Sequence, residues 1–162
     1  MAAINYTLTW EDSTLSGKIT TDSGGRTRFG IAEKFHPELT ASLFYTTMGT
    51  APALVVARGI YYRSYAVPLC IIDIDNQDIA NKLLSLGVNI GLVPAAKMLQ
   101  DAVHVTGDGH IGPLTLNALD TADPLLVLAD MRAMAVAYYR ELTARNPSDA
   151  IYLNGWLSRA NA

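Results

Sequence analysis

The chain has 162 residues, half of them hydrophobic and 17% charged, with a formal net charge of −3. This composition excludes an intrinsically disordered chain, and the length indicates a single domain that can bury a sizeable core. Because the sequence contains no run of Lys or Arg, we expect neither a nucleic-acid partner nor a polybasic membrane-binding segment.

The sequence lacks the features of an exported or membrane-spanning chain. No apolar stretch approaches the roughly 18 residues that a transmembrane helix requires. The first residues also lack a basic region followed by an apolar one. We therefore expect cytoplasmic synthesis without a signal peptide and no stable insertion in a membrane. Cys70 is the single cysteine, which excludes an internal disulfide framework.

The first elements expected along the chain are a short helix and a turn-rich segment with short strands. Within residues 3–13, Ile4, Leu8 and Glu11 follow the 3.6-residue period of one helix face. Glu11 therefore lies at the end of the face that should point inward. Residues 17–30 combine glycines with several threonines, a composition typical of short strands joined by turns.

The rest of the chain is expected to be mainly helical. Capping residues and prolines mark several helix starts, among them Asn76, Pro113 and Pro124. The expected helical segments are residues 31–35, 40–47, 50–65, 75–86, 94–103, 113–119, 124–145 and 148–158. The sequence thus predicts one mainly α domain over residues 1–162, with a small β-element near the N-terminus.

Two carboxyl-bearing residues near this β-element suit the hydrolysis of a glycosidic bond. Glu11 on an apolar helix face would be partly desolvated, which disfavours the ionised form and suits a general acid. Asp22 could act across the glycine-rich turn as a base or charge stabiliser, and Thr27 could orient an attacking water. From residue chemistry alone, a plain helix-end glutamate beside a hairpin turn at Gly24 and Gly25 stays open.

Ordered motifs extend from Glu11 to the C-terminal end of the chain. Glu11 is followed by Asp22-Ser23-Gly24-Gly25-Arg26-Thr27-Arg28-Phe29-Gly30-Ile31, and the second half contains Val88-Asn89-Ile90-Gly91 and Asp108-Gly109-His110-Ile111-Gly112-Pro113. Together these motifs resemble glycoside hydrolase family 108, over about residues 6–160. The two glycines that follow the glutamate in that family are Asp12 and Ser13 here.

The resemblance implies a lysozyme-like fold and N-acetylmuramidase activity. Residues 1–85 would form the catalytic lobe, and residues 86–162 a helical lobe like a peptidoglycan-binding region. Glu11 matches the family's catalytic glutamate, and Asp22 and Thr27 follow the order of the catalytic trio of phage-type lysozymes. Asp22 could instead only hold the Gly-Gly turn, by accepting hydrogen bonds from backbone N–H groups.

Aromatic and small polar residues are the candidate sugar-binding groups. Sugars stack their apolar faces on aromatic rings, although one tyrosine of each adjacent pair could simply pack in the core. Asn89 lies among small residues that could line a cleft, or it could be a buried hydrogen-bonded side chain. The candidate substrate-binding residues are Gly24, Gly25, Arg26, Tyr61, Tyr62, Asn89 and Tyr139.

The sequence predicts no metal site and no cofactor. His104, Asp108 and His110 lack the further ligand that a closed zinc site requires. Residues 73–78 lack the glycine and the later glutamate of a calcium loop. Two carboxyl groups and a water molecule suffice for glycoside hydrolysis, so no metal is needed.

The resemblance implies a peptidoglycan hydrolase that cleaves the β-1,4 bond between N-acetylmuramic acid and N-acetylglucosamine. Peptidoglycan glycan strands are the expected partner. A small muramidase fits a monomeric phage endolysin that reaches the cell wall in the periplasm through a holin or another export route. The alternative is a non-catalytic peptidoglycan-binding or secretion-associated protein, which would tolerate loss of Glu11.

Overall fold

The computed structural model describes residues 1–22 and 25–162, with only the backbone described at residue 22. The chain begins with helix α1 (Ala2–Glu11) and continues into a three-stranded antiparallel sheet in the order β1-β2-β3. The strands are β1 (Thr20–Asp22), β2 (Gly25–Arg28) and β3 (Ile31–Ala32). The following helices are α2 (Thr50–Tyr61), α3 (Gln77–Ile90), α4 (Leu92–Ala102), α5 (Pro113–Thr121), α6 (Pro124–Arg145) and α7 (Leu153–Asn161).

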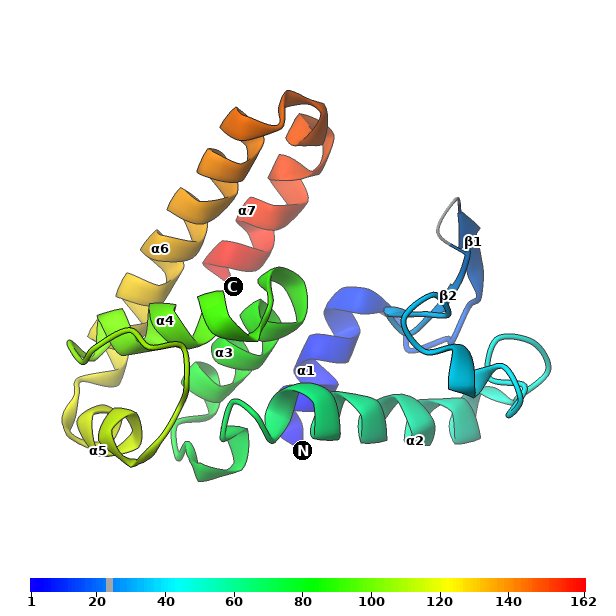
Figure 1. Cartoon of the computed structure of the whole chain (residues 1–162), viewed down its shortest axis with the longest axis horizontal. Coiled ribbons are helices and arrows are strands. Elements are labelled where there is room, and N and C mark those ends of the chain that lie inside the picture. The colour runs from blue at the N-terminus through cyan, green and yellow to red at the C-terminus, as the bar shows by residue number, and fades with distance from the viewer. Residues whose placement is uncertain (23–24) are drawn as a thin grey trace.

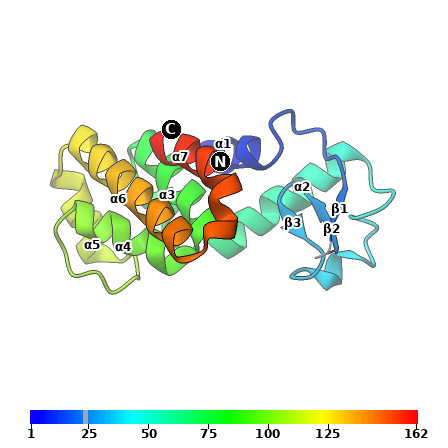
Figure 2. The ribbon, with the colours of Figure 1, turned by 90° about the horizontal axis from the view of Figure 1, so that it is seen from above.

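The sheet and the helical part of the molecule lie at opposite ends. Figure 1 shows the sheet beside the start of α2, whereas α3 to α7 gather at the far end. Helix α2 runs between the two ends, and α1 lies where they join. The view from above in Figure 2 shows the same division between the sheet and the helices. The last turn of α1 therefore lies between the sheet and the helices.

Helix α3 forms the centre of the hydrophobic core. It packs against α1, α4 and α6, and the side chains of Leu83, Leu84 and Leu86 are fully buried. Asn76 caps its N-terminus by accepting hydrogen bonds from the backbone N–H groups of Asp78 and Ile79. Burial of apolar surface stabilises the fold by about 25 cal/mol per Å². This helix therefore fixes the position of α1, which carries Glu11 at its end.

A buried arginine holds the irregular part of the sheet region together. Arg28 is only 4% exposed. Its Nε donates to the carbonyl oxygen of Gly17 at 2.8 Å, and its Nη1 donates to those of Phe44 and Met48 at 2.8 and 2.7 Å. One side chain thus ties the loop after α1 to the segment before α2. Burial lowers the pKa of the Arg28 guanidinium.

The helices predicted from capping residues and prolines are confirmed, with ends that move by a few residues. Helix α2 continues beyond Tyr61 as a π-helical turn over Tyr62–Ala66, so the predicted segment 50–65 is helical throughout. Two short predictions are wrong. Residues 31–35 begin with strand β3 rather than a helical turn, and residues 40–47 form successive turns after the 3₁₀ helix Pro37–Leu39.

The turn at Asp108 is organised by a buried glutamine. Gln100 is 2% exposed, and its Nε2 donates to Asp108 Oδ1 and the His110 carbonyl oxygen, while its Oε1 accepts from the Gly109 N–H. Within residues 1–22 and 25–162, no group of three or more potential metal ligands lies close enough together to hold an ion. In the same residues, no helix combines the length and the apolar character needed to cross a bilayer.

Candidate functional site

Glu11 is the last residue of α1, and its carboxyl faces a cleft. Ile4 and Leu8 on the same helix face are 2% and 0% exposed, which fixes the rotation of α1 about its axis. Glu11 extends that face beyond the core. A cavity of about 280 Å³ lies against its carboxyl, between α1, α2, the end of α3 and the segment after β3. Glu11 is thus held by a well-packed helix, and its side chain lines a cleft.

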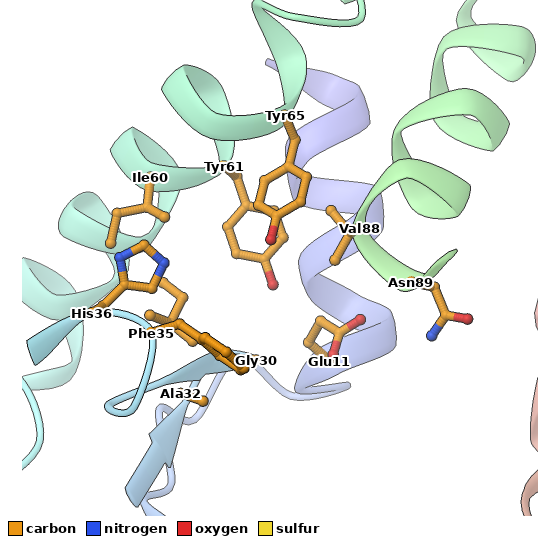
Figure 3. A pocket seen from close by; sticks show the side chains of 11 residues that line it. Glu11, Gly30, Ala32, Phe35, His36, Ile60, Tyr61, Tyr65, Val88 and Asn89 are labelled. Atoms are coloured by element: carbon orange, nitrogen blue, oxygen red, sulfur yellow. The ribbon is translucent and has the colours of Figure 1, made fainter. Parts of the chain in front are cut away.

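Aromatic and polar side chains line the α2 side of this cleft. Figure 3 shows the hydroxyl ends of Tyr61 and Tyr65 pointing into the same space as the Glu11 carboxyl. The Tyr61 hydroxyl donates to the carbonyl oxygen of Phe29 at 3.0 Å, and burial raises its pKa, so it stays a neutral donor. Phe35 lines the opposite wall and is 74% exposed. An exposed ring beside a cleft is a suitable stacking surface for a sugar.

A second hollow meets the first at Glu11. Its volume is about 420 Å³, and Glu11, Asp12, Lys18, Thr20 and Thr27 are among its lining residues. Thr20 and Thr27 lie directly opposite each other on β1 and β2. The two hollows share Glu11 and Gly30. Glu11 therefore lies between two adjoining hollows, which we call together the groove, and Thr27 lines the hollow on its sheet side.

Gly30 is required where the groove passes Glu11. Its φ of +73° lies in the left-handed region, which glycine adopts without strain. A Cβ at this position would lie 2.8 Å from Glu11 Cγ, 2.9 Å from Glu11 Oε2 and 2.7 Å from the Tyr61 hydroxyl oxygen. The turn between β2 and β3 therefore packs its backbone directly against the Glu11 side chain, and a residue larger than glycine would displace that side chain or Tyr61.

Asp12 closes the loop that follows Glu11. Its Oδ2 accepts from the Gly17 N–H at 2.7 Å and from the Ser16 hydroxyl at 3.2 Å. The Thr14 hydroxyl donates to its Oδ1 at 3.3 Å. Asp12 and Ser13 stand where the family that the sequence resembles has two glycines. Here they lie in a turn that the Asp12 carboxylate holds by hydrogen bonds. This turn keeps the loop at one edge of the groove and leaves Glu11 accessible.

Arg159, near the C-terminal end, forms an ion pair with Glu11. Its Nη2 donates to Glu11 Oε1 at 2.5 Å, and its guanidinium also lies over the Trp10 ring, 5.6 Å from the centroid. The Arg159 side chain is 7% exposed and that of Glu11 22%. This charge-assisted hydrogen bond fixes the direction in which the Glu11 carboxyl points.

Asn89 lines the cleft, and a hydrogen bond from the buried Tyr139 holds its side chain. It occupies the last turn of α3, and its Oδ1 accepts from the Tyr139 hydroxyl at 2.6 Å. Tyr139 is 1% exposed and stacks on Trp156 with ring centroids 5.5 Å apart. With its oxygen engaged in this way, the Asn89 amide N–H₂ is available to donate to a ligand in the cleft. Tyr139 itself is a core residue that positions Asn89.

Other predicted substrate-binding residues lie away from the groove lining. Arg26 forms an ion pair with Glu33 and donates to the Tyr45 carbonyl oxygen. Tyr62 is 39% exposed on the π-helical turn after α2. Gly25 begins β2 opposite Asp22. Gly24 and the side chain of Asp22 lie outside the described residues.

The Arg26–Glu33 ion pair makes a pH-dependent contribution to stability. The Arg26 guanidinium, and next the Thr40 hydroxyl, lower the pKa of Glu33 from 4.5 to about 2. Because the folded-state pKa is lowered, the stabilisation is present above pH 4.5 and disappears as the pH falls through about 2. We expect Glu33→Gln to lower the Tm at pH 7, with the difference from wild type shrinking between pH 4.5 and 2.

Thermal unfolding of both proteins across this pH range measures the effect. Glu141→Gln is the control, because Glu141 and Arg145 form an exposed ion pair, with side chains 62% and 72% exposed, which contributes little. A Tm difference for Glu33→Gln that stays constant down to pH 2 would contradict the assignment.

Several groove residues were not among the predicted site residues. Phe35 ends the segment 31–35 that was predicted to be helical, and His36 follows it. Val88 lines it from the motif around Asn89, and Tyr65 from the tyrosine-rich stretch after α2. Arg159 lies 148 positions from Glu11, so only the fold brings the two together.

Comparison with known proteins places this geometry in a family. Residues 4–91 match the family described as glycosyl hydrolase 108, and residues 94–161 match the family described as "Predicted Peptidoglycan domain". The solved structure of SagA from Brucella abortus is similar to 98% of this chain and 87% of that chain, with a TM-score of 0.74 and 22% sequence identity. A comparison with curated proteins gave no significant match.

The fold and the groove define a mainly α, lysozyme-like glycoside hydrolase that acts on peptidoglycan. The chain belongs to the glycosyl hydrolase 108 family, and its C-terminal half is a peptidoglycan-binding region.

Proposed function

We propose that the protein is an N-acetylmuramidase in which Glu11 is the catalytic acid. The observation that supports this role is the position of Glu11, which lines both of the adjoining hollows. The bond cleaved is the β-1,4 linkage between N-acetylmuramic acid and N-acetylglucosamine. A glycan strand lying along the groove passes Glu11, so one of its glycosidic oxygens comes within reach of the carboxyl.

In the proposed reaction Glu11 donates its proton to the leaving glycosidic oxygen. The C–O bond then breaks, and positive charge develops on the sugar ring. Thr27 lines the hollow on the sheet side of Glu11, where its hydroxyl can orient the attacking water. Asp22, which ends β1, stabilises the charge or takes the proton of that water. Two carboxyl groups and one water complete the hydrolysis.

Arg159 has two effects on this acid. In the free protein its guanidinium donates a hydrogen bond to the Glu11 carboxyl and fixes the direction in which that carboxyl points. During proton donation negative charge develops on the carboxyl, and the same guanidinium stabilises that charge as it forms. A preorganised cation directed at developing charge is among the strongest catalytic devices available to a protein.

The groove walls suit an N-acetylated sugar polymer. In the cleft between α1, α2 and α3, the exposed ring of Phe35 offers a stacking surface, and the Asn89 amide can donate to an acetamido carbonyl oxygen. On the sheet side, Lys18 is the cation among the lining residues. The carboxylate of a muramic acid lactyl group or its attached peptide is the substrate charge that Lys18 can bind.

The proposed biological role is host lysis by a monomeric phage endolysin that reaches the periplasmic face of the wall through a holin or another export route. What supports this role is the union of a glycoside hydrolase groove and a peptidoglycan-binding region in one compact chain. Protein expressed inside a bacterium should lyse the culture only when a holin is co-expressed or the inner membrane is permeabilised. Lysis by the expressed protein alone would contradict dependence on an export route.

Analysis of the products tests the proposed bond specificity. Purified peptidoglycan is digested, the new reducing ends are reduced with borohydride, and the fragments are identified by mass spectrometry. We expect reduced N-acetylmuramic acid ends. Reduced N-acetylglucosamine ends would identify a glucosaminidase instead. Release of no fragments, with the protein still pelleting on cell walls, would favour a non-catalytic peptidoglycan-binding protein.

A further inference from the structure

A lysine ammonium is buried in the helical core, behind the proposed active site. Lys82 lies on α3 and is 4% exposed. Its Nζ donates to the carbonyl oxygens of Arg159 at 2.9 Å and Ala160 at 2.8 Å. A buried charge is costly unless its donors are satisfied. Here the partners are carbonyl groups in the last turn of α7, the negative end of that helix's dipole.

The surroundings of Lys82 are strongly positive. Burial, together with the positive charges of Arg132 and Arg159, lowers the pKa of Lys82 from 10.5 to about 8. Arg132 also binds the end of the chain, because its Nη2 donates to the Ala162 carbonyl oxygen at 2.9 Å. An apolar side chain of similar length would pack at this place without the cost of burying a cation. Packing alone therefore does not explain a charged lysine at position 82.

Arg159 connects this lysine to the groove. Its carbonyl oxygen accepts from Lys82, while its guanidinium bonds to Glu11 on α1 and lies over Trp10. Three helices that are distant in sequence, α3, α7 and α1, thus meet through a single residue. A shift of the last turn of α7 would move the guanidinium relative to the carboxyl that it holds.

We propose that Lys82 is a positioning residue: it holds the last turn of α7 so that the Arg159 guanidinium stays on the Glu11 carboxylate. Its effect on catalysis rests on the proposed role of Glu11 as the acid. Its effect on the geometry of the Arg159–Glu11 pair does not depend on that role.

A double-mutant cycle on kcat tests the proposal through catalysis. We expect Lys82→Met to lower kcat by about 10- to 100-fold, the effect of a displaced catalytic group, with little change in KM. Arg159→Met should lower kcat at least as much. The double variant should be no slower than Arg159→Met alone, because both changes act on one contact. Lys97→Met, an exposed lysine on α4, is the matched control and should keep wild-type kcat.

Two kinetic outcomes would overturn the proposal. The first is a double variant whose loss is the product of the two single losses, which indicates independent effects. The second is a Lys82→Met variant that keeps wild-type kcat. If Lys82→Met fails to fold, Lys82→Gln, which keeps N–H donors without the charge, enters the same cycle and should show a smaller loss with the same non-additivity.

A spectroscopic measurement tests the geometry without any assay of activity. In protein labelled with ¹³C at glutamate carboxyl groups, the Glu11 signal is assigned by its disappearance in Glu11→Gln. We expect Arg159→Met and Lys82→Met to displace this signal in the same direction, and Lys97→Met to leave it unmoved. A Glu11 signal unchanged in Lys82→Met would refute the positioning role. A displaced signal in a protein that cleaves no glycan would instead show that the proposed function has failed.

Discussion

Glu11→Gln is expected to lower kcat on peptidoglycan by roughly 10²- to 10⁴-fold, the usual contribution of a general acid. The amide has nearly the size of the carboxyl group and can still accept the hydrogen bond from Arg159, but it has no acidic proton to give. Because the shape of the groove is retained, KM should change little. The measurement is the initial rate of turbidity loss of purified cell walls across a range of wall concentrations.

Glu141→Gln is the matched control for this change. Glu141 lies on the exposed side of α6, and its side chain is 62% exposed. The same chemical change there should leave kcat at the wild-type value. Wall clearing by Glu11→Gln at a rate close to that of the wild type would remove Glu11 from the mechanism.

Gly30→Ala is expected to lower kcat by about 100-fold, the scale of loss produced by a displacement near 1 Å at a catalytic group. The new Cβ would lie 2.9 Å from Glu11 Oε2 and 2.7 Å from the Tyr61 hydroxyl oxygen. The Tyr61 hydroxyl has little freedom to move, because it donates to the Phe29 carbonyl oxygen. The Glu11 carboxyl must therefore yield, and its bond to Arg159 yields with it. The positive φ should also lower the free energy of unfolding by about 1–2 kcal/mol.

Gly91→Ala separates the effect of the contact from that of the backbone. Gly91 has a φ of +96°, so alanine is strained there too, but the nearest atom to its Cβ would be Pro94 Cδ at 3.8 Å. We expect a similar fall in Tm with kcat close to that of the wild type. If Gly30→Ala loses stability alone and keeps its kcat, the close approach of the turn to Glu11 has no catalytic importance.

Elements with signals in their own sequence could be predicted. Asn76 caps α3 and Pro124 begins α6, and each predicted helix start lies within two residues of the observed one. The segments at 31–35 and 40–47 could not be predicted in the same way. Within 31–35, strand β3 forms by pairing with β2. The conformation of 40–47 depends on Arg28, whose bonds to the carbonyl oxygens of Phe44 and Met48 form only in the folded chain.

The groove residues also divide into those with a signal in the local sequence and those that depend on the folded chain. Glu11 and Thr27 belong to an ordered motif, and the structure brings both to one hollow. Tyr139 was a candidate for sugar contact, and the structure instead places it behind Asn89, because burial against Trp156 uses its ring and Asn89 uses its hydroxyl. Contacts such as that of Arg159 with Glu11 depend on the packing of whole helices, which local patterns do not encode.

The most direct test is a crystal structure of Glu11→Gln with a bound glycan fragment of alternating N-acetylglucosamine and N-acetylmuramic acid. We expect the strand to lie along both hollows, with one glycosidic oxygen within about 3.2 Å of the side-chain amide at position 11. We also expect a sugar of the bound strand to contact Phe35 or Asn89. A fragment bound elsewhere on the protein, with no glycosidic oxygen near position 11, would contradict the proposed role of Glu11.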